Sequence, residues 1–188
     1  FFILSDKNAG SGFLNKISGD GEPSPQDKAI EERREKDHEW LLAKDLKHYY
    51  LTSSDGLKLH ASFLPSQAPS NRYVLGIHGY RCYGTKEFDS ISRFYHENGF
   101  NSFLIDQRAH GESEGKYITF GIKEADDCMA WLKFMRKEFG EDIEIVLHGI
   151  SMGAATVMLM SGKLLPNNVV FAVADCGYSS LKDQLIYN

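Results

Sequence analysis

The segment Gly149-Ile150-Ser151-Met152-Gly153 constrains the fold more than any other, because it joins two runs of different character. An apolar run of strand type, 143–147, precedes it, and small residues typical of a packed helix begin at Ala154. Glycines two positions before and two after a serine let the backbone turn sharply where a Cβ would collide. The pattern therefore predicts a strand–turn–helix unit that presents the hydroxyl of Ser151 as a nucleophile.

A second glycine turn, His78-Gly79-Tyr80, ends the apolar run that begins at Tyr73. Acyl transfer needs two backbone N–H groups that converge on the substrate carbonyl oxygen, one from the residue after the nucleophile and one from an earlier loop. The N–H groups of Met152 and Tyr80 are the candidates for this oxyanion hole. The N-terminus of the helix after Ser151 would favour negative charge at the same place.

Six apolar runs have the length of strands. They lie at 47–52, 58–64, 73–78, 102–106, 143–148 and 169–174. From the third run onward they alternate with helical patterns, which predicts parallel strands joined by crossover helices.

The helical patterns predict which faces are buried. Residues 86–97 turn Phe88, Ile91 and either Phe94 or Tyr95 inward, and 152–164 is apolar nearly all round, so we expect burial on every side. In 121–139, which Gly140 ends, apolar residues recur every three or four positions. They are Ile122, Ala125, Met129, Leu132, Met135 and Phe139.

These motifs and their order resemble the α/β-hydrolase superfamily from about Lys47 onward. The matching pieces are Ser53–Ala61 for the opening hairpin, Ile77–Tyr80 for the oxyanion loop, Asp106–Ser113 for the D-x-R-x-H-G-x-S loop, and Gly149–Gly153 for the nucleophile elbow. The resemblance implies an α/β fold, a mostly parallel twisted sheet with helices on both faces. Within the superfamily the chain is most similar to bacterial esterases and serine-aminopeptidase-like hydrolases, whose members often carry an N-terminal membrane anchor. Ile150 departs from the many relatives that have histidine there.

The catalytic base is not evident. In this superfamily the triad follows the order serine, acid, histidine, yet every histidine of this chain precedes Ser151. They are His38, His48, His60, His78, His96, His110 and His148. The resemblance assigns His110 a structural role, and the alternative that His110 substitutes as the catalytic base is left open. His78 and His148 are expected to be packed residues.

Three aspartates are considered as the acid. Asp175 closes the sixth run and is the candidate, Asp106 closes the fourth and is expected to organise its loop, and Asp183 is expected on the surface. The resemblance implies two further βα units after 169–174, about 60 residues or more. We expect those units to carry the triad histidine and acid and any lid, so the last strands are absent and this fragment alone is inactive.

The first 45 residues differ from the hydrolase-like part, 46–188. Ser5–Pro25 is rich in small polar residues, which indicates a linker. Ser24 is the expected N-cap of a charged, solvated helix, and we expect Trp40–Leu42 at its far end to dock on the hydrolase-like part. Because the chain begins at Phe1 without methionine, a membrane anchor or signal segment upstream of residue 1 is one alternative. That would make the protein membrane-anchored or extracytoplasmic; otherwise we expect it in the cytoplasm.

Composition and charge limit the classes of partner and cofactor that we expect. The formal charge of −5, without a basic stripe, argues against nucleic acid, and no apolar run reaches the roughly 18 residues of a membrane span. The cysteines Cys82, Cys128 and Cys176 are too widely spaced for a C-x-x-C site and are expected to be buried free thiols. No metal or cofactor motif is found.

The function predicted from the sequence is a serine hydrolase that cleaves an ester, thioester or amide of a small-molecule acyl substrate through an acyl-enzyme on Ser151. Two alternatives stay open. The same nucleophile would serve an acyltransferase, and a chain that lacks its base would be a non-catalytic binding module.

Overall fold

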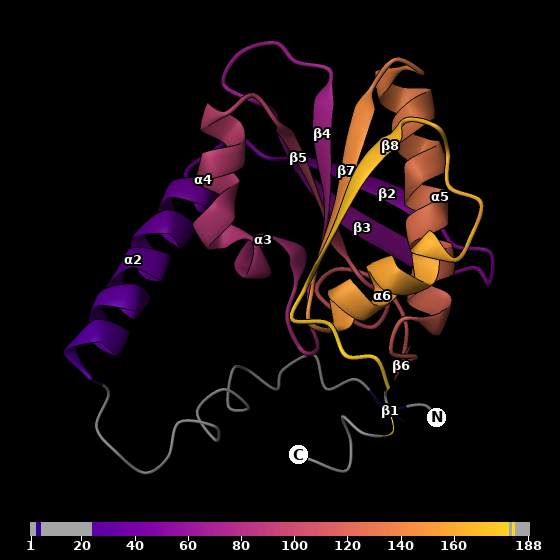
Figure 1. The fold of residues 1–188 in the computed structure, drawn as a ribbon, viewed down its shortest axis with the longest axis horizontal. Coiled ribbons are helices and arrows are strands. Elements are labelled where there is room, and N and C mark those ends of the chain that lie inside the picture. The colour runs from indigo at the N-terminus through magenta and orange to yellow at the C-terminus, as the bar shows by residue number, and fades with distance from the viewer. Residues whose placement is uncertain (1–2, 5–23, 181, 183–188) are drawn as a thin grey trace.

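The computed structural model describes residues 3–4, 24–180 and 182. Most of the expected linker (5–23) and Asp183 lie outside these residues. The six predicted strands form one twisted sheet in the order β2-β3-β5-β4-β7-β8 (Figure 1). Their bounds are β2 Lys47–Thr52, β3 Lys58–Leu64, β4 Arg72–Ile77, β5 Asn101–Asp106, β7 Glu144–Ile150 and β8 Val169–Asp175.

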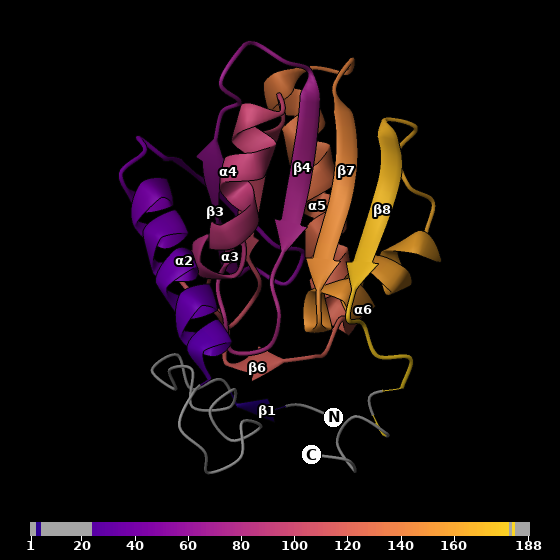
Figure 2. The ribbon, with the colours of Figure 1, turned by 60° about the vertical axis from the view of Figure 1, so that its left-hand side comes forward.

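The sheet contains both antiparallel and parallel strand pairs. β3 pairs antiparallel with β2 and with β5, whereas β5, β4, β7 and β8 form a parallel set. The carboxyl ends of β4, β7 and β8 lie at the same edge of the sheet (Figure 2). A short antiparallel pair, β1 (Ile3–Leu4) with β6 (Tyr117–Ile118), lies outside this sheet. The parallel strands confirm the alternation predicted from the sequence.

Helices cover both faces of the sheet (Figure 1). On one face, α5 (Ile122–Phe139) and α6 (Met152–Ser161) enclose the main core, in which Trp131 packs edge-on against Phe103 of β5. On the other face lie α2 (Pro25–Leu42), α3 (Gly84–Glu87) and α4 (Asp89–Glu97). None of the helices in the described part of the chain combines the length and apolar character needed to cross a bilayer.

The charged helix α2 begins as predicted. The N–H of Asp27 donates to the Ser24 hydroxyl at 3.2 Å, and the Asp27 carboxylate accepts from the Ser24 N–H at 2.9 Å, which completes a capping box. At its far end Leu41 is fully buried in a cluster with Leu64 and Phe88. The helix therefore docks through its last turn, while most of its charged run stays exposed.

The helix predicted over 86–97 breaks at Phe88 into α3 and α4, which corrects its bounds. Its predicted inward face is confirmed, and of the two alternatives left open Tyr95 points inward and Phe94 is exposed. One residue predicted to be inward in the next helix is wrong. In α5, Ile122 is 66% exposed because it lies roughly 120° around the helix from the fully buried Cys128.

The predicted bounds and burial of α6 also need correction. The helix ends at Ser161, where Gly162 caps it, rather than at 164. Residues 152–157 are all buried, as predicted, whereas Met158 and Leu159 in the last turn are about half exposed. The predicted burial on every side therefore holds for the first turns of the helix and fails for its last turn.

Only one of the three cysteines is a buried thiol. Cys128 is buried in α5, whereas Cys82 is partly buried and Cys176 is exposed. Cys176 follows β8, the last strand of the sheet in the described part of the chain, and no described helix covers the outer side of that strand. The expectation of three buried thiols is therefore wrong for Cys82 and Cys176.

Candidate active site

The candidate site lies at the carboxyl ends of the neighbouring parallel strands β4 and β7, where Ile77 pairs with Gly149. The chain runs from β4 to β5 on one side and later returns to β7 on the other. In open α/β sheets such a reversal of strand order leaves a crevice where ligands bind. Both glycine turns identified in the sequence lie at this reversal.

Ser151 occupies a sharp turn between β7 and α6. Its φ is 54° and its ψ is −112°, a conformation that non-glycine residues adopt only where the surroundings enforce it. A Cβ on Gly149 would collide with the backbone of Gly153, and a Cβ on Gly153 would collide with the carbonyl group of Ile77. The two glycines are therefore sterically required, as the sequence pattern predicted.

The loop after β4 touches the serine. A Cβ built on Gly79 would lie 3.3 Å from the Cβ of Ser151. The N–H of Gly79 donates to the carboxylate of Glu87 at 2.9 Å, which holds the loop in place. The N–H groups of Tyr80 and Met152 have no hydrogen-bond partner among the described residues.

A buried network supports this loop. The Nδ1–H of His78 donates to the carbonyl of Gly79 at 2.7 Å, and its Nε2 accepts from the backbone N–H of Gln107 at 2.9 Å. The Gln107 side-chain amide donates to the His78 carbonyl at 2.5 Å, and its oxygen accepts from Thr156 of α6 at 3.3 Å. Burial and the neighbouring His110 lower the pKa of His78 to about 3, so this ring stays neutral and holds the loop. Reasoning from the sequence missed Gln107, which only the packed loops bring to this place.

His110 and His148 are also engaged elsewhere. The Nδ1–H of His110 donates to the carbonyl of Arg108 at 2.9 Å, and its Nε2 accepts from the N–H of Arg81 at 3.2 Å. His148 pairs through Nδ1 with the hydroxyl of Tyr95 at 2.8 Å, and burial lowers its pKa. The structure thus places both rings in structural contacts.

The backbone of Asp175 lies against the elbow. Its carbonyl oxygen accepts the Ser151 N–H at 2.8 Å. Its exposed carboxylate accepts from the thiol of Cys176 at 3.1 Å, which raises the pKa of that thiol. Within residues 24–180 no histidine hydrogen-bonds this carboxylate, so the described part of the chain shows no acid–histidine pair at the serine.

Asp106 has the organising position expected for it. Its carboxylate accepts from the N–H groups of Gly84 and Glu112, each at 2.9 Å, and from Nδ1 of His60 at 2.8 Å. Burial alone would raise the pKa of Asp106, but these hydrogen bonds lower it below its ordinary value. Asp106 is therefore a charged anchor for the loop. Its carboxylate oxygens are occupied by these contacts, so it is not a candidate for the triad acid.

Arg108 joins the same loop to two other elements. Its guanidinium donates twice to Asp127 of α5, both at 2.7 Å, and twice to Asp55 in the β2–β3 turn, at 3.0 and 3.2 Å. A cavity of about 580 Å³ lies beside this network, lined in part by Lys123, and Ser151 does not line it. The ion pairs explain why the D-x-R-x-H-G-x-S pattern includes arginine.

The strand–turn–helix unit at Ser151, the Gly79 loop beside it and the mostly parallel sheet with helices on both faces define the α/β-hydrolase class. A family model described as "Serine aminopeptidase, S33" matches residues 68–176, more than half of the sequence. The chain therefore belongs to this family. The match confirms both the resemblance and the expected fold class.

Three relatives illustrate the similarity. The Pyrococcus furiosus esterase Pf2001 is 27% identical with a TM-score of 0.61, over 84% of this chain and 56% of the esterase. The uncharacterized protein YqkD of Bacillus subtilis (strain 168) is 34% identical over 89 residues, 47% of this chain and 29% of YqkD. An α/β serine hydrolase without lid from Xanthomonas campestris, at 19% identity and a TM-score of 0.55, shares the fold over 65% of this chain and 58% of that one. The chain thus spans little more than half of the esterase and under a third of YqkD.

Proposed function

We propose that this chain is the nucleophile-bearing part of a serine hydrolase that cleaves an ester, thioester or amide of a small-molecule substrate. The observation that carries the proposal is the left-handed backbone of Ser151 at the start of α6, in contact with the Gly79 loop. Membership of the serine aminopeptidase family and the likeness to an esterase support a hydrolase.

The proposed chemistry begins with attack of the Ser151 Oγ on the substrate carbonyl carbon, while a base takes the hydroxyl proton. The oxyanion is held by the N–H groups of Tyr80 and Met152, and the dipole of α6 adds to its stabilisation. The bond to the leaving group breaks as that group takes up the proton. Water then attacks the acyl-enzyme, which releases the acid and restores the Ser151 hydroxyl.

The base in this proposal is a histidine beyond the printed sequence, paired with a carboxylate there. Two of the histidines support this assignment, because His78 and His110 use both ring nitrogens to hold loops. Asp175 is kept as a second candidate acid because its backbone contacts the elbow. An acyltransferase would use the same groups with an alcohol or amine in place of water, and product analysis with acceptors present separates the two.

The test compares two serines of the same helix region in the full-length protein. Ser151→Ala should abolish fluorophosphonate labelling and hydrolysis of short acyl esters. Ser161→Ala, at the far end of α6, should retain both, since the Ser161 hydroxyl donates to the carbonyl of Val157 within its own helix. Turnover by purified Ser151→Ala would refute the nucleophile, and a full-length wild type that binds acyl ligands without turnover would favour the binding module.

A further inference from the structure

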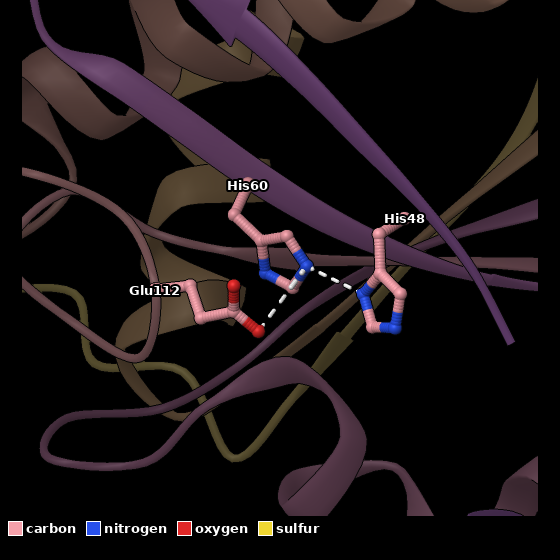
Figure 3. Close-up of side chains that lie close together, drawn as sticks. All are labelled: His48, His60 and Glu112. Carbon is pink, nitrogen blue, oxygen red and sulfur yellow. Dashed lines mark hydrogen bonds and ion pairs between the residues drawn. The ribbon is translucent and has the colours of Figure 1, made fainter.

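Two histidines and a glutamate converge on one side of the sheet, apart from the elbow (Figure 3). His48 comes from β2, His60 from β3 and Glu112 from the loop after β5. Nε2 of His60 lies 2.9 Å from Nδ1 of His48 and 3.7 Å from Oε1 of Glu112. Figure 3 shows both interactions meeting at the same ring nitrogen.

The hydrogen bonds of His60 decide what this nitrogen offers. Its Nδ1 lies 2.8 Å from the carboxylate of Asp106, which only accepts, so Nδ1 carries a proton, and in the neutral tautomer that binds metals the lone pair lies on Nε2. His48 can donate to that lone pair, but the carboxylate of Glu112 cannot. In this tautomer Nε2 of His60 and Oε1 of Glu112 face each other as two acceptors, an arrangement that a cation between them would satisfy.

The surrounding groups resemble those that orient metal ligands. A ligating histidine usually donates its second ring N–H to a carboxylate, as His60 does to Asp106. The same carboxylate oxygen of Asp106 also accepts the backbone N–H of Glu112 at 2.9 Å, so one group positions two of the three side chains. The Tyr50 hydroxyl donates to the other carboxylate oxygen of Glu112 at 2.9 Å and leaves Oε1 facing His60.

We infer that His48, His60 and Glu112 bind one divalent transition-metal ion, of which Zn²⁺ fits best. Tetrahedral Zn²⁺ with bonds of about 2.0–2.1 Å places its ligand atoms about 3.3 Å apart, so the two pairs that include His60 need to move by only about 0.4 Å. The third pair, His48 with Glu112, lies within 4.8 Å and closes by the movement of these two side chains. His48 and Glu112 are exposed and able to make that adjustment, whereas His60 is buried and fixed. Water completes the coordination on the exposed side.

The bound ion would join strands β2 and β3 to the loop 106–113, whose Gln107 holds the oxyanion loop. The site is independent of the proposed hydrolysis, and its donor set excludes Mg²⁺ and Ca²⁺, which prefer oxygen ligands. No motif spacing reveals it, because His48 and His60 are 12 residues apart on paired strands and Glu112 lies far along the chain.

The experiment uses the full protein with any affinity tag removed, titrated with Zn²⁺, Co²⁺ and Mg²⁺. We expect one Zn²⁺ per chain by calorimetry, a rise in melting temperature with Zn²⁺ but not Mg²⁺, and visible absorption with Co²⁺ that Zn²⁺ displaces. A wild type that binds neither Zn²⁺ nor Co²⁺ would overturn the inference.

Variants assign the ligands. His48→Ala and Glu112→Gln should each weaken Zn²⁺ binding by about tenfold or more, a loss at least as large as that for removing an outer-shell partner. His96→Ala is the control, since this ring lies outside the cluster and bonds the carbonyl of Pro65, and it should bind as wild type does. Both ligand positions are exposed, so the metal-free melting temperatures of the variants should match wild type within a few degrees. Binding that persists in His48→Ala and Glu112→Gln would also overturn the inference.

Discussion

Replacing Gly153 with alanine tests the packing that holds the elbow in place. The added Cβ would collide with the carbonyl group of Ile77 and would lie 2.7 Å from the carbonyl oxygen of His78. Both contacts are with backbone at the end of β4, so no flexible side chain can give way. The first turn of α6 must therefore move away from β4.

The magnitude follows from that geometry. Overpacking a well-packed interior usually costs about 1–3 kcal/mol, and rigid backbone on the opposite side places Gly153→Ala at the upper end, about 3 kcal/mol. For a chain of this size such a loss lowers the melting temperature by roughly 6–12 °C. Turnover should fall further than stability, because the shift carries the N–H of Met152 away from Tyr80, and losing one oxyanion donor costs about 10²–10³ in rate.

A matched control lies at the other end of the same helix. At Gly162 the nearest atom to an added Cβ is the carbonyl oxygen of Leu159 at 3.5 Å, an ordinary contact, and φ is −81°. Gly162→Ala should therefore stabilise the protein by about 0.4–1 kcal/mol, because it restricts the unfolded chain. Urea unfolding and ester hydrolysis of both variants provide the measurement. Equal stability for Gly153→Ala and wild type would refute the proposed packing of α6 against β4.

Two further predictions concern the loops around the site. Gly79→Val should cut turnover by about 10²–10³, because the valine side chain would press on Glu87 and Ser151 and displace the Tyr80 N–H. Tyr80→Phe should change kcat little, and equal damage from both substitutions would give the Tyr80 hydroxyl a chemical role. Hydrogen bonds from Arg108 lower the pKa of Asp55, so its stabilising effect is complete above the ordinary carboxyl pKa of about 3.9 and is lost as the pH falls through the lower folded value. Asp55→Asn should therefore reduce stability at neutral pH and flatten its fall in acid, and an unchanged acid limb in urea titrations would contradict this.

Local patterns in the sequence were enough to predict the strand and the helix that flank Ser151. The strand before Ser151, the helix after it and the two glycines depend on residues within a few positions of one another, and backbone sterics act at that range. The N-cap at Ser24 and the helix stop at Gly140 were predictable for the same reason. Turn chemistry and periodicity are properties of short segments.

Tertiary structure decided which of those segments meet. Tyr95 rather than Phe94 is buried because the hydroxyl of Tyr95 finds His148 on β7, a partner that the spacing within α4 does not show. The contact of Gln107 with the oxyanion loop likewise depends on the order of strands in the sheet. Such contacts join residues far apart in sequence, so no local propensity predicts them.

The cluster of His48, His60 and Glu112 shows the same limit most clearly. The sequence determined that each residue lies in or beside a strand, but only the antiparallel register of β2 on β3 and the turn after Asp106 bring their ligand atoms together. Strand pairing converts distant positions into neighbours a few ångströms apart. The sequence by itself thus determined the turn that presents Ser151, the proposed nucleophile, whereas the folded sheet decided what surrounds it.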